Sequence, residues 1–184
     1  MKSYSLWKGS KFREATGFSG LSNKEQDKIF NDLEITALIY TLLFLEDRAS
    51  KKNDKDDVVY LNIGEYIISA FLELMVGAQV SNTQLKLWRK LIELRQREYR
   101  KNVDYTMKES REWGVFEPGD KLLHQVWGRI LALSLGTLKH IKHDSKASIK
   151  DPLWPVLRRW LVGLEVELTQ IFKDTDLREL KVLN

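Results

Sequence analysis

Proline is absent from the first 117 residues of this 184-residue chain, whose three prolines stand at positions 118, 152 and 155. Because proline removes a helical hydrogen bond and clashes with the preceding turn, a long stretch without it favours long helices. Leucine, lysine, glutamate and arginine, all good helix formers, dominate the chain, and few segments alternate between apolar and polar residues. The sequence therefore predicts an all-α protein, a bundle of about five helices in a single domain over residues 1–184.

Short polar motifs mark where the predicted helices begin. Ser22 with Glu25 forms a capping box, in which the serine hydroxyl accepts the Glu25 amide and the glutamate bonds back to the serine. The same spacing recurs from positions 62 and 81. With Asp120 and Asp151-Pro152 as later start signals, helices are predicted over residues 22–48, 62–78, 81–113, 120–142 and 151–173. The remaining segments are an N-terminal arm (1–21), a solvated loop (50–57), a short extended piece (58–61) and a C-terminal tail (175–184).

Two apolar runs, Ile35–Leu45 and Tyr66–Ala78, predict core helices, because a helix that is apolar on every side is buried on every side. Each run is shorter than the ~20 residues that cross a bilayer. The first residues carry no long apolar stretch of the kind found in secretory signals. We therefore expect no membrane span and a cytoplasmic location.

The residue types that enzymes use in recognisable patterns are scarce here. The chain has no cysteine, which excludes disulfides, thiolate metal sites and cysteine nucleophiles. It also lacks a phosphate-binding glycine loop, a serine nucleophile elbow and a dinucleotide fingerprint. The first hypothesis is a non-enzymatic helical interaction module without a cofactor, which acts as an adaptor, a regulator or a subunit of an assembly. Its partner is another protein or a second copy of the chain.

The predicted third helix carries a basic face. At 100° per residue its cations fall within about 120° of one another, with only Glu93 and Asp104 on the same arc. The face spans about 37 Å at 1.5 Å per residue. It indicates either a solvated surface with intrahelical ion pairs or a contact for a nucleic-acid backbone, an acidic protein or lipid headgroups. A nucleic-acid-associated protein is the alternative hypothesis. The cations are Lys86, Arg89, Lys90, Arg97, Arg100, Lys101, Lys108 and Arg111.

Arg95 projects from the opposite, apolar side of the same helix. A buried arginine needs a partner, because an unpaired buried charge is very costly. Glu73 stands alone on an otherwise apolar helix, so we predict a buried Arg95–Glu73 pair. The functional alternative is that Arg95 lines a pocket for an anionic ligand.

Two further features predict close contacts. Gly128, Ala132 and Gly136 recur at four-residue spacing, and glycine weakens an exposed helix, so another helix, another subunit or a ligand is expected against them. The segment from 150 to 160 interleaves aromatic and basic residues. Its Trp154, Arg158 and Arg159 are predicted to lie at an interface.

A metal-dependent hydrolase with a histidine–carboxylate site is the lesser alternative. His124, His143, Asp144 and Asp174 supply the ligand types that such a site needs. Lysines crowd the central His-Asp pair and disfavour a cation there, so no metal is assigned.

Overall fold

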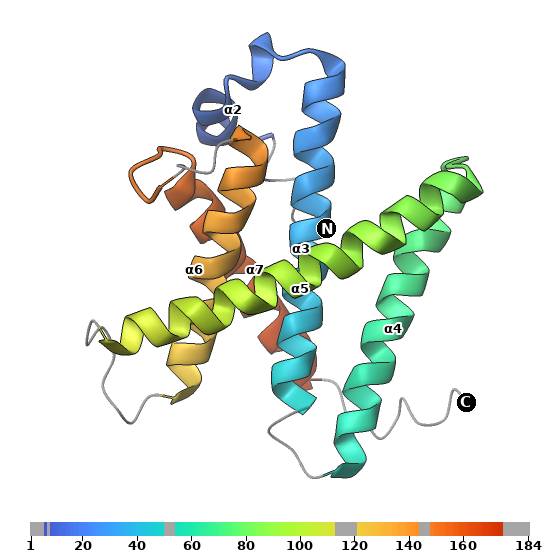
Figure 1. The fold of residues 1–184 in the computed structure, drawn as a ribbon, viewed down its shortest axis with the longest axis vertical. Helices are drawn as coiled ribbons and strands as arrows, with labels where there is room; N and C mark the ends of the chain where they lie inside the picture. Colours follow the sequence, from blue (N-terminus) through green and yellow to red (C-terminus); the bar gives the residue numbers. More distant parts are fainter. Residues whose placement is uncertain (1–5, 7, 50–53, 113–120, 144–147, 175–184) are drawn as a thin grey trace.

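The computed structural model describes residue 6 and residues 8–49, 54–112, 121–143 and 148–174; it does not describe the side chains of 54–57, 109–112, 121–124 and 174. All regular secondary structure in this part of the chain is helical, without a strand, which confirms the all-α prediction. Its elements are α2 (Ser10–Thr16), the 3₁₀ turn η1 (Phe18–Gly20), α3 (Asn23–Ala49), α4 (Asp54–Gly77), α5 (Asn82–Glu112), α6 (Lys121–Lys142) and α7 (Trp154–Asp174) (Figure 1).

Two of the three predicted capping boxes form; the third, from Asn62 to Glu65, does not, because both residues lie inside α4. The Ser22 amide donates to Glu25 Oε2 at 2.9 Å, and the Glu25 amide donates back to Ser22 Oγ at 3.3 Å. Ser81 and Gln84 exchange the same bonds ahead of α5. At the start of α7, the Leu153 amide donates to Asp151 Oδ1 at 2.8 Å, and Pro155 lies in the first turn. Local capping therefore fixes where α3, α5 and α7 begin.

Helix α3 is the core helix of the bundle and lies between the other helices (Figure 1). It packs against α4, α5, α6 and α7. Leu33, Ile39 and Tyr40 on it are fully buried. The prediction that residues 35–45 form a buried helix is confirmed. In the N-terminal arm, Phe12 and Phe18 join the same core and lie 6.4 Å apart, ring centroid to ring centroid.

Helix α4 differs from its prediction in extent and in burial. It begins at Asp54, so residues 54–61 are helical and not a loop and an extended piece. A run of charged residues is as compatible with the first turn of a helix as with a loop, so charge alone does not decide between the two. The expectation of a core helix over 66–78 is also wrong, because Tyr66 is 73% exposed and Leu74 is 70% exposed. Only the side with Tyr60 and Phe71 is buried.

The exposure of α4 bears on membranes as well. Its Val58–Gly77 segment is, by length and composition alone, long and apolar enough to cross a bilayer, although one such helix is weak evidence for a span. Of the 18-residue apolar window within that segment, only 11% is buried. Within the described residues, α4 packs mainly against α3. Aromatic contacts join it to α5 and α7, with the Phe71 and Trp88 rings 5.8 Å apart and the Tyr60 and Phe172 rings 6.0 Å apart.

Candidate functional site

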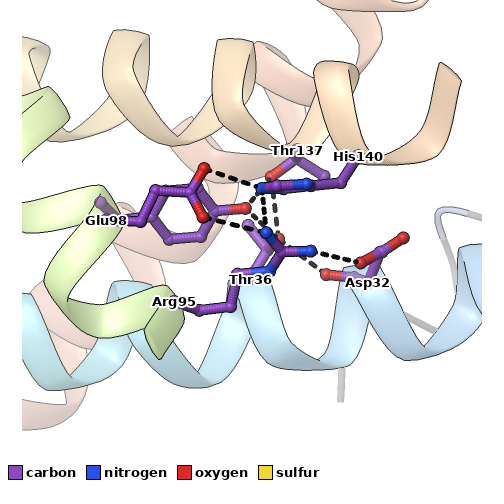
Figure 2. Close-up of polar contacts among 7 residues, drawn as sticks. Asp32, Thr36, Arg95, Glu98, Thr137 and His140 are labelled. Atoms are coloured by element: carbon purple, nitrogen blue, oxygen red, sulfur yellow. Dashed lines mark hydrogen bonds and ion pairs between the residues drawn. The ribbon is translucent and has the colours of Figure 1, made fainter. Parts of the chain in front are cut away.

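A polar network joins α3, α5 and α6 around Arg95 (Figure 2). Arg95 Nη1 donates to Glu98 Oε2 at 2.9 Å, and Arg95 Nη2 lies 3.6 Å from Asp32 Oδ1. His140 Nε2 lies 2.5 Å from Arg95 Nη1 and 3.0 Å from Glu98 Oε1. When Nε2 carries a hydrogen it donates to Glu98, and without one it accepts from Arg95. The predicted Arg95–Glu73 pair is therefore wrong, since Glu73 is exposed on α4 and forms no ion pair with Arg95.

Three buried hydroxyl groups extend this network inward. Thr36 Oγ1 donates to the Asp32 carbonyl at 2.7 Å and lies 2.8 Å from Thr137 Oγ1. Tyr99 OH lies 3.3 Å from Thr137 Oγ1 and 3.4 Å from Thr36 Oγ1. Thr36 and Thr137 are 0% exposed, and burial raises the pKa of Tyr99 to about 12. No substrate reaches these hydroxyls in this packing, so their chemical role is to fasten three helices together.

The two carboxylates beside Arg95 have opposite electrostatic environments. Burial raises the pKa of Asp32 despite the attraction of Arg95. The hydrogen bond from His140 and the neighbouring Arg95 lower the pKa of Glu98 to about 2, against its burial. Glu98 therefore supplies the stable negative charge, and Asp32 is the carboxylate that burial penalises.

A second buried cation is Arg129, which was not predicted from the sequence. Its side chain forms ion pairs with Asp47 and, at 2.9 Å, with Glu165 Oε2. Tyr40 OH donates to the same Glu165 oxygen at 2.8 Å. Arg129 is 3% exposed, and its guanidinium lies 5.7 Å from the ring centroids of Tyr40 and Phe44. The signal in the sequence is Glu165, which lies on the same side of α7 as the apolar residues Leu161 and Leu168.

The small residues of α6 face α5. A Cβ added to Gly128 would lie 2.6 Å from Met107 Cγ, and one added to Gly136 would overlap the Tyr99 ring. Ala132, between them, is also buried. Of the three occupants predicted for this stripe, the structure shows a helix of the same chain. The stripe is therefore not a surface for a second molecule.

The basic face of α5 is exposed at all seven positions where side chains are described; Arg111 lies outside those residues. Arg100 Nη2 bonds to Glu46 Oε1 at 2.6 Å, and Arg97 Nε bonds to the Glu93 carbonyl at 3.4 Å. The other five cations form no ion pair with the part of the chain that the structure describes: Lys86, Arg89, Lys90, Lys101 and Lys108.

Two hollows flank Trp160 on α7. The larger, about 770 Å³, lies between α2 and the start of α7 and includes Arg159. The smaller, about 230 Å³, is an apolar groove between α3, α4 and α7. Of the other residues predicted at this interface, Arg158 stacks over Trp154, with its Cζ 4.8 Å from the ring centroid. The structure thus brings Trp154 and Arg158 together and places Arg159 in a hollow.

The metal hypothesis falls largely outside the described side chains. His143 is exposed and has a positive φ of 50°, whereas the side chains of His124, Asp144 and Asp174 are not described. Among the side chains that are described, no group of three histidines and carboxylates is arranged to hold a metal ion.

No known protein family, curated protein or solved structure matches this chain. A function is therefore argued from the apolar groove, the exposed apolar residues of α4 and the basic face of α5.

Proposed function

We propose that this protein is a helical interaction module that receives an amphipathic helix of a protein partner. The observation that supports the proposal is the apolar groove between α3, α4 and α7, with Tyr66 and Leu74 exposed at its edge. Uncovered apolar surface of this kind marks contact sites in soluble proteins. A helix whose apolar residues recur every three to four positions fits such a groove. An adaptor, a regulator or a subunit of an assembly would use the site in this way.

The charges around the groove define the partner further. Glu34 lines the groove, and Glu65 and Glu73 are exposed on α4. The described side chains of α4 include no lysine or arginine. Opposite charges favour encounter and fix the orientation of a bound helix, so the partner helix carries lysines or arginines beside its apolar row. The proposed role needs no catalytic step.

Site-specific photo-crosslinking tests this role in the cells that make the protein. A photoreactive residue in place of Leu74, and separately of Tyr66, is expected to capture one discrete protein, identified by mass spectrometry. The same residue in place of Lys24, exposed at the start of α3, is the control and captures none. Adducts of equal yield at all three positions, or none at Leu74 and Tyr66, argue against the groove as a partner site.

The exposed cations of α5 support a second role, contact with a nucleic-acid backbone. Binding to a 20-base-pair duplex is expected to weaken with salt, with a logarithmic slope of about −0.9 for each phosphate contacted. Replacing Lys90, Arg97 and Lys101 with alanine lowers that slope, whereas replacing Lys24 and Lys28 on α3 does not. Absence of duplex binding at low salt removes this role and leaves the groove proposal untouched.

A further inference from the structure

The larger hollow lies on the other side of Trp160 from the proposed helix groove. Residues of α2, the turn before α7 and the first half of α7 surround it. Its volume of about 770 Å³ is in the range of sites that bind small molecules, roughly 300–1,000 Å³. Its lining is Leu6, Lys11, Glu14, Ala15, Pro152, Pro155, Val156, Arg159, Trp160 and Gly163.

The lining combines apolar residues with two cations. Pro152, Val156 and Trp160 are among the seven uncharged residues that make up most of it. Lys11 and Arg159 are exposed and form no ion pair with the described residues, although Glu14 lines the same hollow. Two cations against one carboxylate leave the hollow with a net positive charge.

The adjacent residues Arg158 and Arg159 differ in whether they line the hollow. Arg158 stacks on the Trp154 ring and does not line the hollow. Arg159 has no such aromatic partner in the described chain, and its guanidinium is available for a bidentate bond to a carboxylate. The adjacent arginines thus provide a matched pair, one lining the hollow and one outside it.

We propose that this hollow binds an amphipathic anion with one acyl chain, of the fatty-acid class. The alkyl chain packs along Pro152, Val156 and Trp160, and the carboxylate bonds to Arg159 and Lys11. Gly163 leaves room for the chain because it has no side chain. Apolar burial provides the affinity, and the cations select the sign of the head group.

Calorimetric titration of the full chain with octanoate, decanoate and dodecanoate, each as the monomer, tests the proposal. Affinity is expected to rise about fourfold for each methylene, the equivalent of about 0.8 kcal/mol. Dodecyltrimethylammonium, with the opposite charge, is expected to bind at least tenfold more weakly. No heat of binding with monomeric dodecanoate, or equal affinity for the cationic amphiphile, overturns the proposal. So does binding to anionic vesicles without binding of the monomer, since the source is then a bilayer surface.

Variants test whether the residues that line the hollow, and not those beside it, bind dodecanoate. Replacing Lys11 and Arg159 together with alanine is expected to weaken dodecanoate binding at least tenfold, whereas Arg158→Ala leaves it within twofold. Gly163→Leu fills the hollow and abolishes binding, with circular dichroism confirming that the helical fold and its melting temperature persist. A loss in Arg158→Ala equal to that in the double variant, or full binding by Gly163→Leu, contradicts the assignment. Neither result affects the crosslinking expected at Leu74.

Discussion

Arg129 is the most deeply buried described charge and is held by carboxylates of two other helices. Arg129→Ala would remove the cation beside Glu165 and leave the Tyr40 hydroxyl as the described hydrogen-bond donor to Glu165 Oε2. Breaking a buried pair from one side costs about 3–5 kcal/mol, so the variant is expected to lose that much unfolding free energy. Urea denaturation followed by circular dichroism measures it. Arg158→Ala, which removes a partly exposed guanidinium, is the control and is expected to lose under about 1 kcal/mol.

Glu98 makes a pH-dependent contribution to stability. Its pKa is lowered to about 2 in the folded chain, so its contribution is present above the ordinary glutamate pKa and is lost as the pH falls toward 2. Glu98→Gln is expected to lose about 1 kcal/mol at pH 7, allowing for solvent screening, and progressively less below pH 4.5. Urea unfolding at pH 7, 4 and 3 measures the difference in unfolding free energy between the wild type and Glu98→Gln. A difference that grows as the pH falls contradicts a lowered pKa at Glu98.

Asp32 behaves in the opposite way. Burial raises its pKa, so the folded state favours the protonated carboxyl. The contribution of Asp32 to the free energy of unfolding therefore falls as the pH rises through that pKa. Asp32→Asn, a neutral side chain of the same shape, is expected to be as stable as the wild type or more so at pH 7. The same urea titration provides the measurement. A large loss at pH 7 means instead that its attraction to Arg95 outweighs burial.

These networks show how far single residues can be predicted from sequence. The helical wheel correctly assigns Arg95 to the inner side of α5, since it depends only on spacing along one helix. It does not reveal which helix lies opposite, so the chosen carboxylate, Glu73, was the wrong one. Arg129 was missed for a related reason. At Arg129, the polar side of α6 is covered by α3 and α7, and tertiary packing decides which polar residues are exposed.

At the scale of helices, the two glycines of α6 allow α5 to approach closely. Gly136→Ala is expected to cost about 1–3 kcal/mol, because the buried Tyr99 ring blocks the added methyl group. Gly128→Ala meets Cγ of Met107, whose unbranched side chain can shift, and the gain in helix propensity, about 1 kcal/mol, offsets most of its cost. Gly64→Ala is the control, since its Cβ would lie 3.5 Å from Leu42 Cδ2, an ordinary contact. Thermal unfolding should rank stability as Gly64→Ala, Gly128→Ala and then Gly136→Ala, and equal losses at 64 and 136 contradict this explanation.

The helix boundaries were predicted best where the signal is local. Capping boxes place the starts of α3 and α5 because both partners of each hydrogen bond lie within four residues. The start of α4 lies eight residues before the predicted one, because the capping spacing of Asn62 and Glu65 falls inside the helix. The charged run before it is equally compatible with a loop and with the first turns of a helix. Its exposure was mispredicted because an apolar sequence indicates that a helix needs to be covered, not what covers it.

For the whole molecule, the incompletely covered helix α4 predicts association. Exposed apolar side chains are solvated poorly, so the purified protein is expected to self-associate as its concentration rises. Leu74→Glu should raise the dissociation constant of self-association, measured by sedimentation, at least tenfold. Because Leu74 is 70% exposed, the substitution should change the free energy of unfolding by under about 1 kcal/mol. Val166→Glu is the matched control, because Val166 is exposed on α7 but does not line the groove. A wild-type monomer at all concentrations, or an equal effect of both substitutions, contradicts the prediction. A partner helix that fills the groove should compete with this self-association, because both would cover the same side chains of α4.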